Sequence, residues 1–185
     1  IQGSWTVEQY LSLDIGRLVE FDSGKLEFLP MPTELHQAIA LFLYMRLRER
    51  IEPKQLGVVF VAPLRVRVSA DRLREPDVLF MFSRNRARRS NSYWDGADLV
   101  MEIVSADDPN RDLVVKRREY AEAGIPEYWI VDPRDRSILV LGLDEASGRY
   151  CEADRCRDGE TARSELIEGF EVSVTEVFNR PEVMQ

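Results

Sequence analysis

The chain has 185 residues, carries a net charge of −8, and is 44% hydrophobic and 31% charged. That length and composition fit one globular domain over residues 1–185 and argue against disorder. No run approaches the roughly 18 consecutive apolar residues of a transmembrane helix, so we expect no membrane span. Residues 1–5 (IQGSW) lack the basic region and apolar run of a signal peptide, so we expect none.

Cysteine and histidine are scarce: Cys151, Cys156 and His36 are the only ones in the chain. A disulfide between the two cysteines is possible, but there is no framework of spaced pairs, which favours a reducing, cytoplasmic setting. One histidine and no C-x-x-C motif argue against a zinc site built from Cys and His.

The charge is unevenly distributed. Residues 72–118 contain ten Lys/Arg and eight Asp/Glu, a balance of +2, which leaves −10 for the rest of the chain. Arg84, Arg86, Arg88 and Arg89 fall in one short stretch, which is either a solvated loop or a set of phosphate contacts. The acidic total counts against nucleic-acid binding, which usually needs a basic face.

The first half of the chain combines strand-like runs with one long helix. Thr6 and Gln9 form a capping-box pattern, which predicts the start of a short helix. Apolar runs at 17–21 and 25–29 flank a Gly-containing turn and predict a hairpin, and apolar residues at helical spacing predict an amphipathic helix over 34–50. Further strands are expected at 57–62, 64–68, 77–82 and 98–105.

The second half begins with a well-marked helix. Asp108 and Pro109 predict its start, Gly124 its C-terminal cap, and Pro126 prevents its continuation. Strands are expected at 127–132, 137–141 and 149–152, and a short helix at 174–178. The pattern predicts an α/β or α+β fold: a mixed sheet carrying helices, with a crossover between the 98–105 and 127–132 strands.

Two carboxylates, Asp77 and Glu102, stand in or beside apolar strands. A charge there is costly unless it is paired or binds a metal, and two on neighbouring strands repel unless a cation lies between them. Mg²⁺ or Mn²⁺ would suit such a pair, because these cations prefer carboxylate oxygens and water. The alternatives are that Asp77 simply begins a strand after proline, and that Glu102 forms a buried ion pair with an arginine.

Lys116 shares one face of the predicted helix with Tyr120 and Ala123, by the i, i+4, i+7 spacing. That face suits packing against a sheet, so the ammonium group would point towards the sheet edge. There it could orient an attacking water and stabilise charge on a phosphate. The alternative is one more solvated lysine in the basic cluster 116–118.

Five motifs stand out along the chain: Glu75-Pro76-Asp77, Asp98-Leu99-Val100-Met101-Glu102-Ile103-Val104-Ser105, Lys116-Arg117-Arg118-Glu119-Tyr120, Gly124-Ile125-Pro126-Glu127-Tyr128-Trp129 and Asp132-Pro133. Together they resemble the Uma-type putative restriction endonuclease family of the PD-(D/E)XK nuclease superfamily. The resemblance covers residues 5–143 and is most specific over 98–133. It implies a restriction-endonuclease-like fold, a mixed central β-sheet flanked by helices, with Asp77 as the motif aspartate and Glu102 as the second acidic residue.

The chain departs from the superfamily pattern at Val104. The usual motif places a lysine two residues after the second acid, on the same strand face. The resemblance implies that Lys116, on the next helix, replaces it. It also implies that His36 and Glu27 could touch the metal site; a structural histidine and an exposed hairpin residue are the alternatives.

These features predict a metal-dependent phosphodiester hydrolase, a DNA endonuclease with Asp77, Glu102 and Lys116 as its catalytic core. Asp77 and Glu102 would bind Mg²⁺ or Mn²⁺, the metal would activate water, and Tyr120 would support the centre. A homodimer is plausible by analogy with other nucleases of this fold. Two rival hypotheses are a nuclease-fold protein that binds or regulates without cutting, and a metal hydrolase of small phosphorylated substrates.

Overall fold

A six-stranded mixed sheet forms the centre of the molecule. The computed structural model describes residues 2–179, and its strands are arranged in the order β11-β10-β9-β8-β6-β3. The parallel pair, β8 with β9, is the crossover expected from the sequence. The strands are β3 (Gly57–Val61), β6 (Val78–Phe82), β8 (Leu99–Ile103), β9 (Glu127–Asp132), β10 (Ser137–Asp144) and β11 (Arg149–Arg157).

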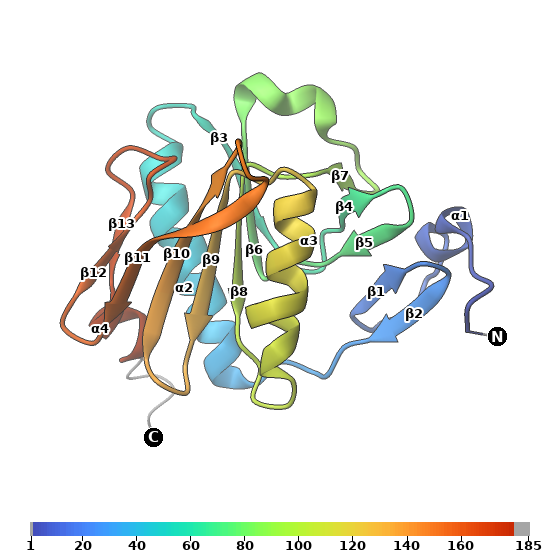
Figure 1. Cartoon of the computed structure of the whole chain (residues 1–185), viewed down its shortest axis with the longest axis horizontal. Coiled ribbons are helices and arrows are strands. Elements are labelled where there is room, and N and C mark those ends of the chain that lie inside the picture. Colours follow the sequence, from blue (N-terminus) through green and yellow to red (C-terminus); the bar gives the residue numbers. More distant parts are fainter. Residues whose placement is uncertain (1, 180–185) are drawn as a thin grey trace.

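A second, five-stranded sheet lies beside the first, on the side of the N-terminus (Figure 1). Its order is β2-β1-β5-β4-β7, so the N-terminal hairpin β1–β2 joins strands that come from the middle of the chain. A small sheet, β12 with β13, lies at the opposite side of the molecule. These strands are β1 (Val19–Asp22), β2 (Lys25–Phe28), β4 (Val66–Ser69), β5 (Arg72–Arg74), β7 (Trp94–Asp95), β12 (Thr161–Arg163) and β13 (Glu171–Ser173).

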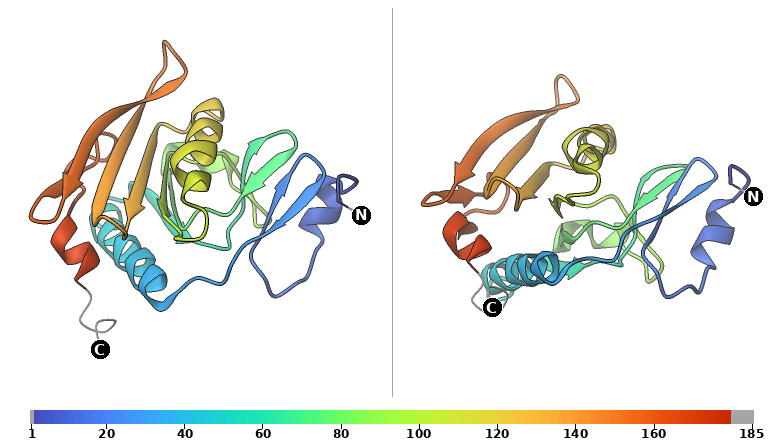
Figure 2. Two further views of the ribbon diagram at one scale, coloured as in Figure 1. Left: turned by 60° about the horizontal axis from the view of Figure 1, so that its bottom comes forward. Right: turned by 90° about the horizontal axis from the view of Figure 1, so that it is seen from below.

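Two helices cover opposite faces of the central sheet (Figure 2). Side chains alternate along a strand, so Val78 and Phe80 of β6 pack with the apolar residues of α2, whereas Leu79 and Met81 pack with Tyr120 of α3. The helical segments are α1 (Val7–Leu11), α2 (Glu34–Ile51), the 3₁₀ helix η1 (Ser83–Arg88), the π-helix η2 (Arg111–Lys116), α3 (Arg117–Glu122) and α4 (Val174–Phe178).

The predicted mixed central sheet flanked by helices is confirmed, with three local differences. The short strands β5, β7, β12 and β13 were not expected, and the helix predicted between 109 and 124 is π-helical over η2 before it becomes α3. The disulfide considered from the sequence is absent: Cys151 and Cys156 are free. Both lie on β11, where five residues of extended chain place them about 16 Å apart, far beyond disulfide reach.

Arg74 connects the N-terminal sheet to α3. Its side chain is 2% exposed and forms a bidentate pair with Glu119 of α3, at 2.8 and 2.9 Å. It also donates to Glu20 at 3.1 Å, to Glu27 at 2.7 Å and to Asp22 at 3.2 Å, all from the hairpin β1–β2. A guanidinium group can be buried here because carboxylates surround it.

Replacing this guanidinium group is therefore expected to weaken the packing of the N-terminal sheet against α3. Arg74→Met should lower the free energy of unfolding by about 3–5 kcal/mol, because it leaves buried carboxylates without a counter-charge. Chemical denaturation measures the change. Arg163→Met, which removes an exposed pair with Glu171, is the control and should have little effect; equal losses in the two variants would contradict the prediction.

Within residues 2–179, no helix combines the length and the apolar character needed to cross a membrane.

Candidate active site

The pairing of β6 with β8 places Asp77 and Glu102 side by side. Val78 is paired with Met101 in this antiparallel ladder. Extending the register by one pair sets Asp77, which precedes β6, opposite Glu102 in β8. Directly opposed residues point to the same face, with Cβ atoms about 4.5–5.5 Å apart. Strand register alone thus brings the two carboxylates together.

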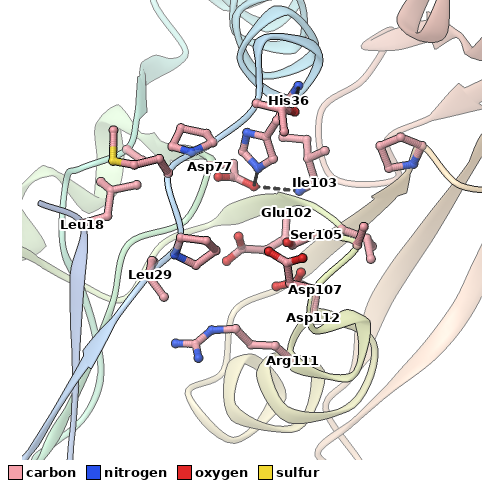
Figure 3. Close-up of a pocket in the computed structure, with 18 of the residues that line it drawn as sticks. Leu18, Leu29, His36, Asp77, Glu102, Ile103, Ser105, Asp107, Arg111 and Asp112 are labelled. Atoms are coloured by element: carbon pink, nitrogen blue, oxygen red, sulfur yellow. Dashed lines mark hydrogen bonds and ion pairs between the residues drawn. The ribbon is translucent and has the colours of Figure 1, made fainter.

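Asp77 is held by one backbone and one side-chain donor. Its Oδ2 accepts a hydrogen bond from the Ile103 amide at 2.7 Å and lies 3.2 Å from Nε2 of His36, at the start of α2 (Figure 3). Burial lowers the pKa of His36, but the hydrogen bond and charge of Asp77 outweigh it, and the pKa lies above its ordinary value. His36 therefore orients Asp77.

Glu102 is 2% exposed and receives two donors on a single oxygen, Oε1. These are the Tyr120 hydroxyl and the Lys116 ammonium group, whose Nζ lies 2.9 Å away. Burial raises the pKa of Glu102 well above its usual range, and the charge of Lys116 opposes that rise. The ion pair expected as an alternative for Glu102 exists, but its partner is lysine rather than arginine.

Lys116 is buried among three carboxylates, so its interpretation as a solvated side chain is wrong. Its Nζ lies 2.9 Å from Glu102, 3.4 Å from Asp112 and 3.5 Å from Glu20, and the residue is 4% exposed. Burial lowers the pKa of Lys116, but these carboxylates raise it well above its usual value. The group therefore stays an ammonium ion and cannot act as a base at neutral pH.

Val104, at the position where the superfamily motif has its lysine, belongs to the apolar core. Val104 lies two residues beyond Glu102 and packs in the same apolar cluster as Tyr120, beneath η2 and α3. Lys116 lies at the junction of these two helical segments. The helix above β8 thus brings the ammonium group to Glu102, while Val104 fills the core.

Two acidic residues of the site, Asp112 and Glu20, were not singled out from the sequence. Asp112 is one helical turn before Lys116, and this i, i+4 spacing was the available signal. Glu20 carried no such signal, because it lies on β1 in a hairpin distant in sequence. Burial raises the pKa of Glu20, but Lys116, Arg111 and Arg74 lower it to about 2.

Glu27 does not reach the two central carboxylates. It pairs with Arg74 and, at 2.8 Å, with Arg111. Arg111 also pairs with Glu20 and lines the same pocket as Asp77. Glu27 therefore belongs to the ion-pair network that borders the site.

The carboxylates lie at the floor of a pocket of about 350 Å³. One side of it is apolar and includes Leu18, Leu29 and Met31, which come from the hairpin and the connection to α2. The backbone of 103–107 contributes to the lining after β8. The pocket is thus an apolar cleft with a charged base.

The donor set fits a divalent metal that is shared with water and substrate. The contacts described above use Oδ2 of Asp77 and Oε1 of Glu102, and among residues 2–179 no hydrogen bond engages the second oxygen of either. In the described part of the chain, no three His, Cys, Asp or Glu side chains are arranged to hold a metal by themselves. Mg²⁺ commonly takes one or two carboxylates and completes its shell with water and phosphate oxygens.

The arginine run lies away from this pocket. Arg84, Arg86 and Arg88 lie in η1, after β6, and Arg89 directly follows it. Asp77 precedes β6, and five strand residues separate it from η1 by about 17 Å. Arg84 lies 3.9 Å from the ring centre of Phe82, and Arg88 donates to the Asp95 carbonyl. These arginines lie near the far end of β6.

A mixed sheet with two opposed carboxylates and a buried lysine is the arrangement that the sequence motifs imply for a restriction-endonuclease-like protein. The chain belongs to the Uma2 family, described as "Putative restriction endonuclease", whose model matches residues 7–175. The structure resembles a crystal structure titled as a putative nuclease of DUF820 from Anabaena variabilis, with a TM-score of 0.75 and 19% identity over 94% of this chain and 97% of that one. At that identity the likeness establishes the fold. No curated protein matches the sequence.

The depressed pKa of Glu20 predicts a loss of stability in acid. Because its pKa is about 2 in the folded protein and ordinarily 4.5, its contribution is complete above about pH 4.5 and is lost as the pH falls towards 2. This contribution is on the order of 3 kcal/mol. The difference in unfolding free energy between wild type and Glu20→Gln should therefore shrink across that window.

Urea denaturation at a series of pH values measures this difference. Glu152→Gln, which alters an exposed pair on β11, is the control and should follow wild type. A pH-independent difference for Glu20→Gln would contradict the ionised, ion-paired state of Glu20.

Proposed function

We propose that this protein is a Mg²⁺- or Mn²⁺-dependent phosphodiester hydrolase of the PD-(D/E)XK type that acts on DNA. One observation carries the proposal: Asp77 and Glu102 are opposed at the base of an open pocket, with the Lys116 ammonium group 2.9 Å from Glu102. The family description and the fold support nuclease chemistry.

Asp77 and Glu102 would hold the metal through the oxygens that the protein leaves without hydrogen bonds. When bound, the metal supplies Lewis-acid stabilisation of the phosphate and a water of lowered pKa. His36 keeps Asp77 oriented, and the Tyr120 hydroxyl fixes Glu102 from the helix side. Second partners of this kind set the direction of ligand oxygens.

Lys116 acts as a fixed positive charge. Its ammonium group can donate to the attacking water or to a phosphate oxygen, where charge develops in the transition state. Hydrolysis forms a bond from the water oxygen to phosphorus and breaks the bond to the leaving oxygen, which takes up a proton. Asp112 and Glu20 hold Lys116 in place for this step.

A non-catalytic binding module remains the rival, and one observation favours it. The Lys116 ammonium group already forms ion pairs with Glu102 and Asp112 without a metal. If that were its only role, the wild-type protein would bind no Mn²⁺ at this site. Metal titration therefore separates the two functions.

Removal of either carboxylate charge should abolish both metal binding and cleavage. Asp77→Asn and Glu102→Gln preserve size but lose the charge that hard cations require. Isothermal titration with Mn²⁺ and cleavage of supercoiled plasmid measure the two properties. Asp71→Asn, an exposed aspartate after β4, is the control, and circular dichroism checks the fold. Undiminished cleavage by either site variant would refute the assignment.

Lys116→Met should separate metal binding from catalysis. Loss of a charge-stabilising donor is expected to slow cleavage about 100-fold to 1000-fold. Mn²⁺ affinity should be kept or increased, because a competing cation has been removed from Glu102. Single-turnover kinetics and metal titration measure both. Loss of Mn²⁺ binding in a folded Lys116→Met protein would argue against this division of roles.

A further inference from the structure

The pocket joins two surfaces of different chemistry. Its base carries the carboxylates and Lys116, whereas Leu18, Leu29 and Met31 line one side. In Figure 3, Leu18 and Leu29 lie on one side of the carboxylates and Ser105 on the other. Met31 is 76% exposed, which is unusual for a large apolar side chain beside a polar centre. The charged bottom of the pocket is sufficient to bind a phosphate group. The apolar wall therefore indicates that the substrate also carries an apolar group beside its phosphate.

The reacting groups lie below the protein surface. Glu102 and Lys116 are each 4% exposed or less, and the side chain of Asp77 is 17% exposed. A phosphodiester must therefore enter the pocket together with part of its nucleotide. In a continuous duplex the bases are stacked and paired, so they offer no free apolar face to the wall. An unpaired nucleotide can present its base, and a base packs well on apolar side chains.

The charge around the pocket also disfavours a duplex. Both arginines that line the pocket have carboxylate partners: Arg111 pairs with Glu20 and Glu27, and Arg134 binds Asp132 through two nitrogens. Proteins that bind duplex DNA neutralise several phosphates with Lys and Arg. The arginine run of η1 is about 17 Å away along β6, at the other end of the sheet.

Building on the hydrolase proposed above, we infer that the substrate is an unpaired nucleotide within a nucleic-acid strand, as in a single strand or a bulge. The nucleobase packs on the wall formed by Leu18, Leu29 and Met31. The phosphate reaches Asp77, Glu102 and Lys116 at the bottom of the pocket. This inference narrows the substrate class and depends on the proposed chemistry.

The experiment compares three end-labelled DNA substrates of one sequence in Mn²⁺: a single strand, the full duplex, and a duplex with an unpaired bulge. The single strand and the bulge should be cleaved about 10-fold faster than the duplex or more, since stacking of one base on a protein contributes on the order of 1–3 kcal/mol. Bis(4-nitrophenyl) phosphate is hydrolysed in parallel and reports the chemistry without a nucleic-acid strand.

Met31→Gln tests the wall, and Met45→Gln is its control, because Met45 is an exposed methionine on α2 that does not line the pocket. Met31→Gln should raise KM for the single strand roughly 5-fold, through lost apolar contact. It should leave the affinity for Mn²⁺, measured by isothermal titration, unchanged. Met45→Gln should behave as wild type with every substrate.

The outcomes separate this inference from the proposed function. Equal or faster cleavage of the duplex overturns the inference, while hydrolysis of bis(4-nitrophenyl) phosphate upholds the chemistry. Hydrolysis of that small diester with no cleavage of any DNA likewise overturns it. Identical kinetics for Met31→Gln and Met45→Gln would mean that the wall does not contact the substrate, which also overturns the inference. No hydrolysis of any substrate in Mn²⁺ rejects the proposed function, and the inference with it.

Discussion

The burial of the Lys116 ammonium group is the constraint on which the site depends. A buried charge is tolerated only where opposite charges surround it, and here they come from three separate elements. Glu102 belongs to the central sheet, Glu20 to the N-terminal sheet, and Asp112 to the helix that carries Lys116 itself. The ammonium group therefore stabilises the packing of both sheets against η2 and α3, and the same contact sets the geometry of the pocket.

The network around Arg74 extends this constraint and shapes the pocket's charge. Glu20 accepts from Arg74 and Arg111 as well as facing Lys116, so one carboxylate is shared by three cations. Because Arg111 is engaged there and with Glu27, its charge is largely neutralised at the pocket wall. Arg111 is therefore less available to a phosphate, which fits the inferred substrate, held by its nucleobase as well as its phosphate.

Sequence patterns predicted the parts of the fold that are long or strongly apolar. Apolar residues at helical spacing revealed the helix α2, and apolar runs revealed the strands β6, β8 and β9. Asp77 and Glu102 could be recognised because a charge in or beside an apolar strand is conspicuous. Glu20 could not be placed, since its contact with Lys116 depends on where a distant hairpin packs. Strands as short as β5 and β7 form through pairing with their neighbours, and a π-helical turn such as η2 is too rare to be expected from a sequence pattern.

The relation between Val104 and Lys116 bears on the chemistry proposed for this site. A lysine at 104 would lie in the apolar cluster beneath α3, where Val104 packs with Tyr120. Lys116 enters from the opposite direction, and Asp112 and Glu20 stabilise its charge there. The proposed chemistry needs an ammonium group beside Glu102, with enough carboxylates around that group to keep it charged. A helix packed over the strand meets that condition as well as the strand itself, at the cost of making the site depend on how firmly the helix is held.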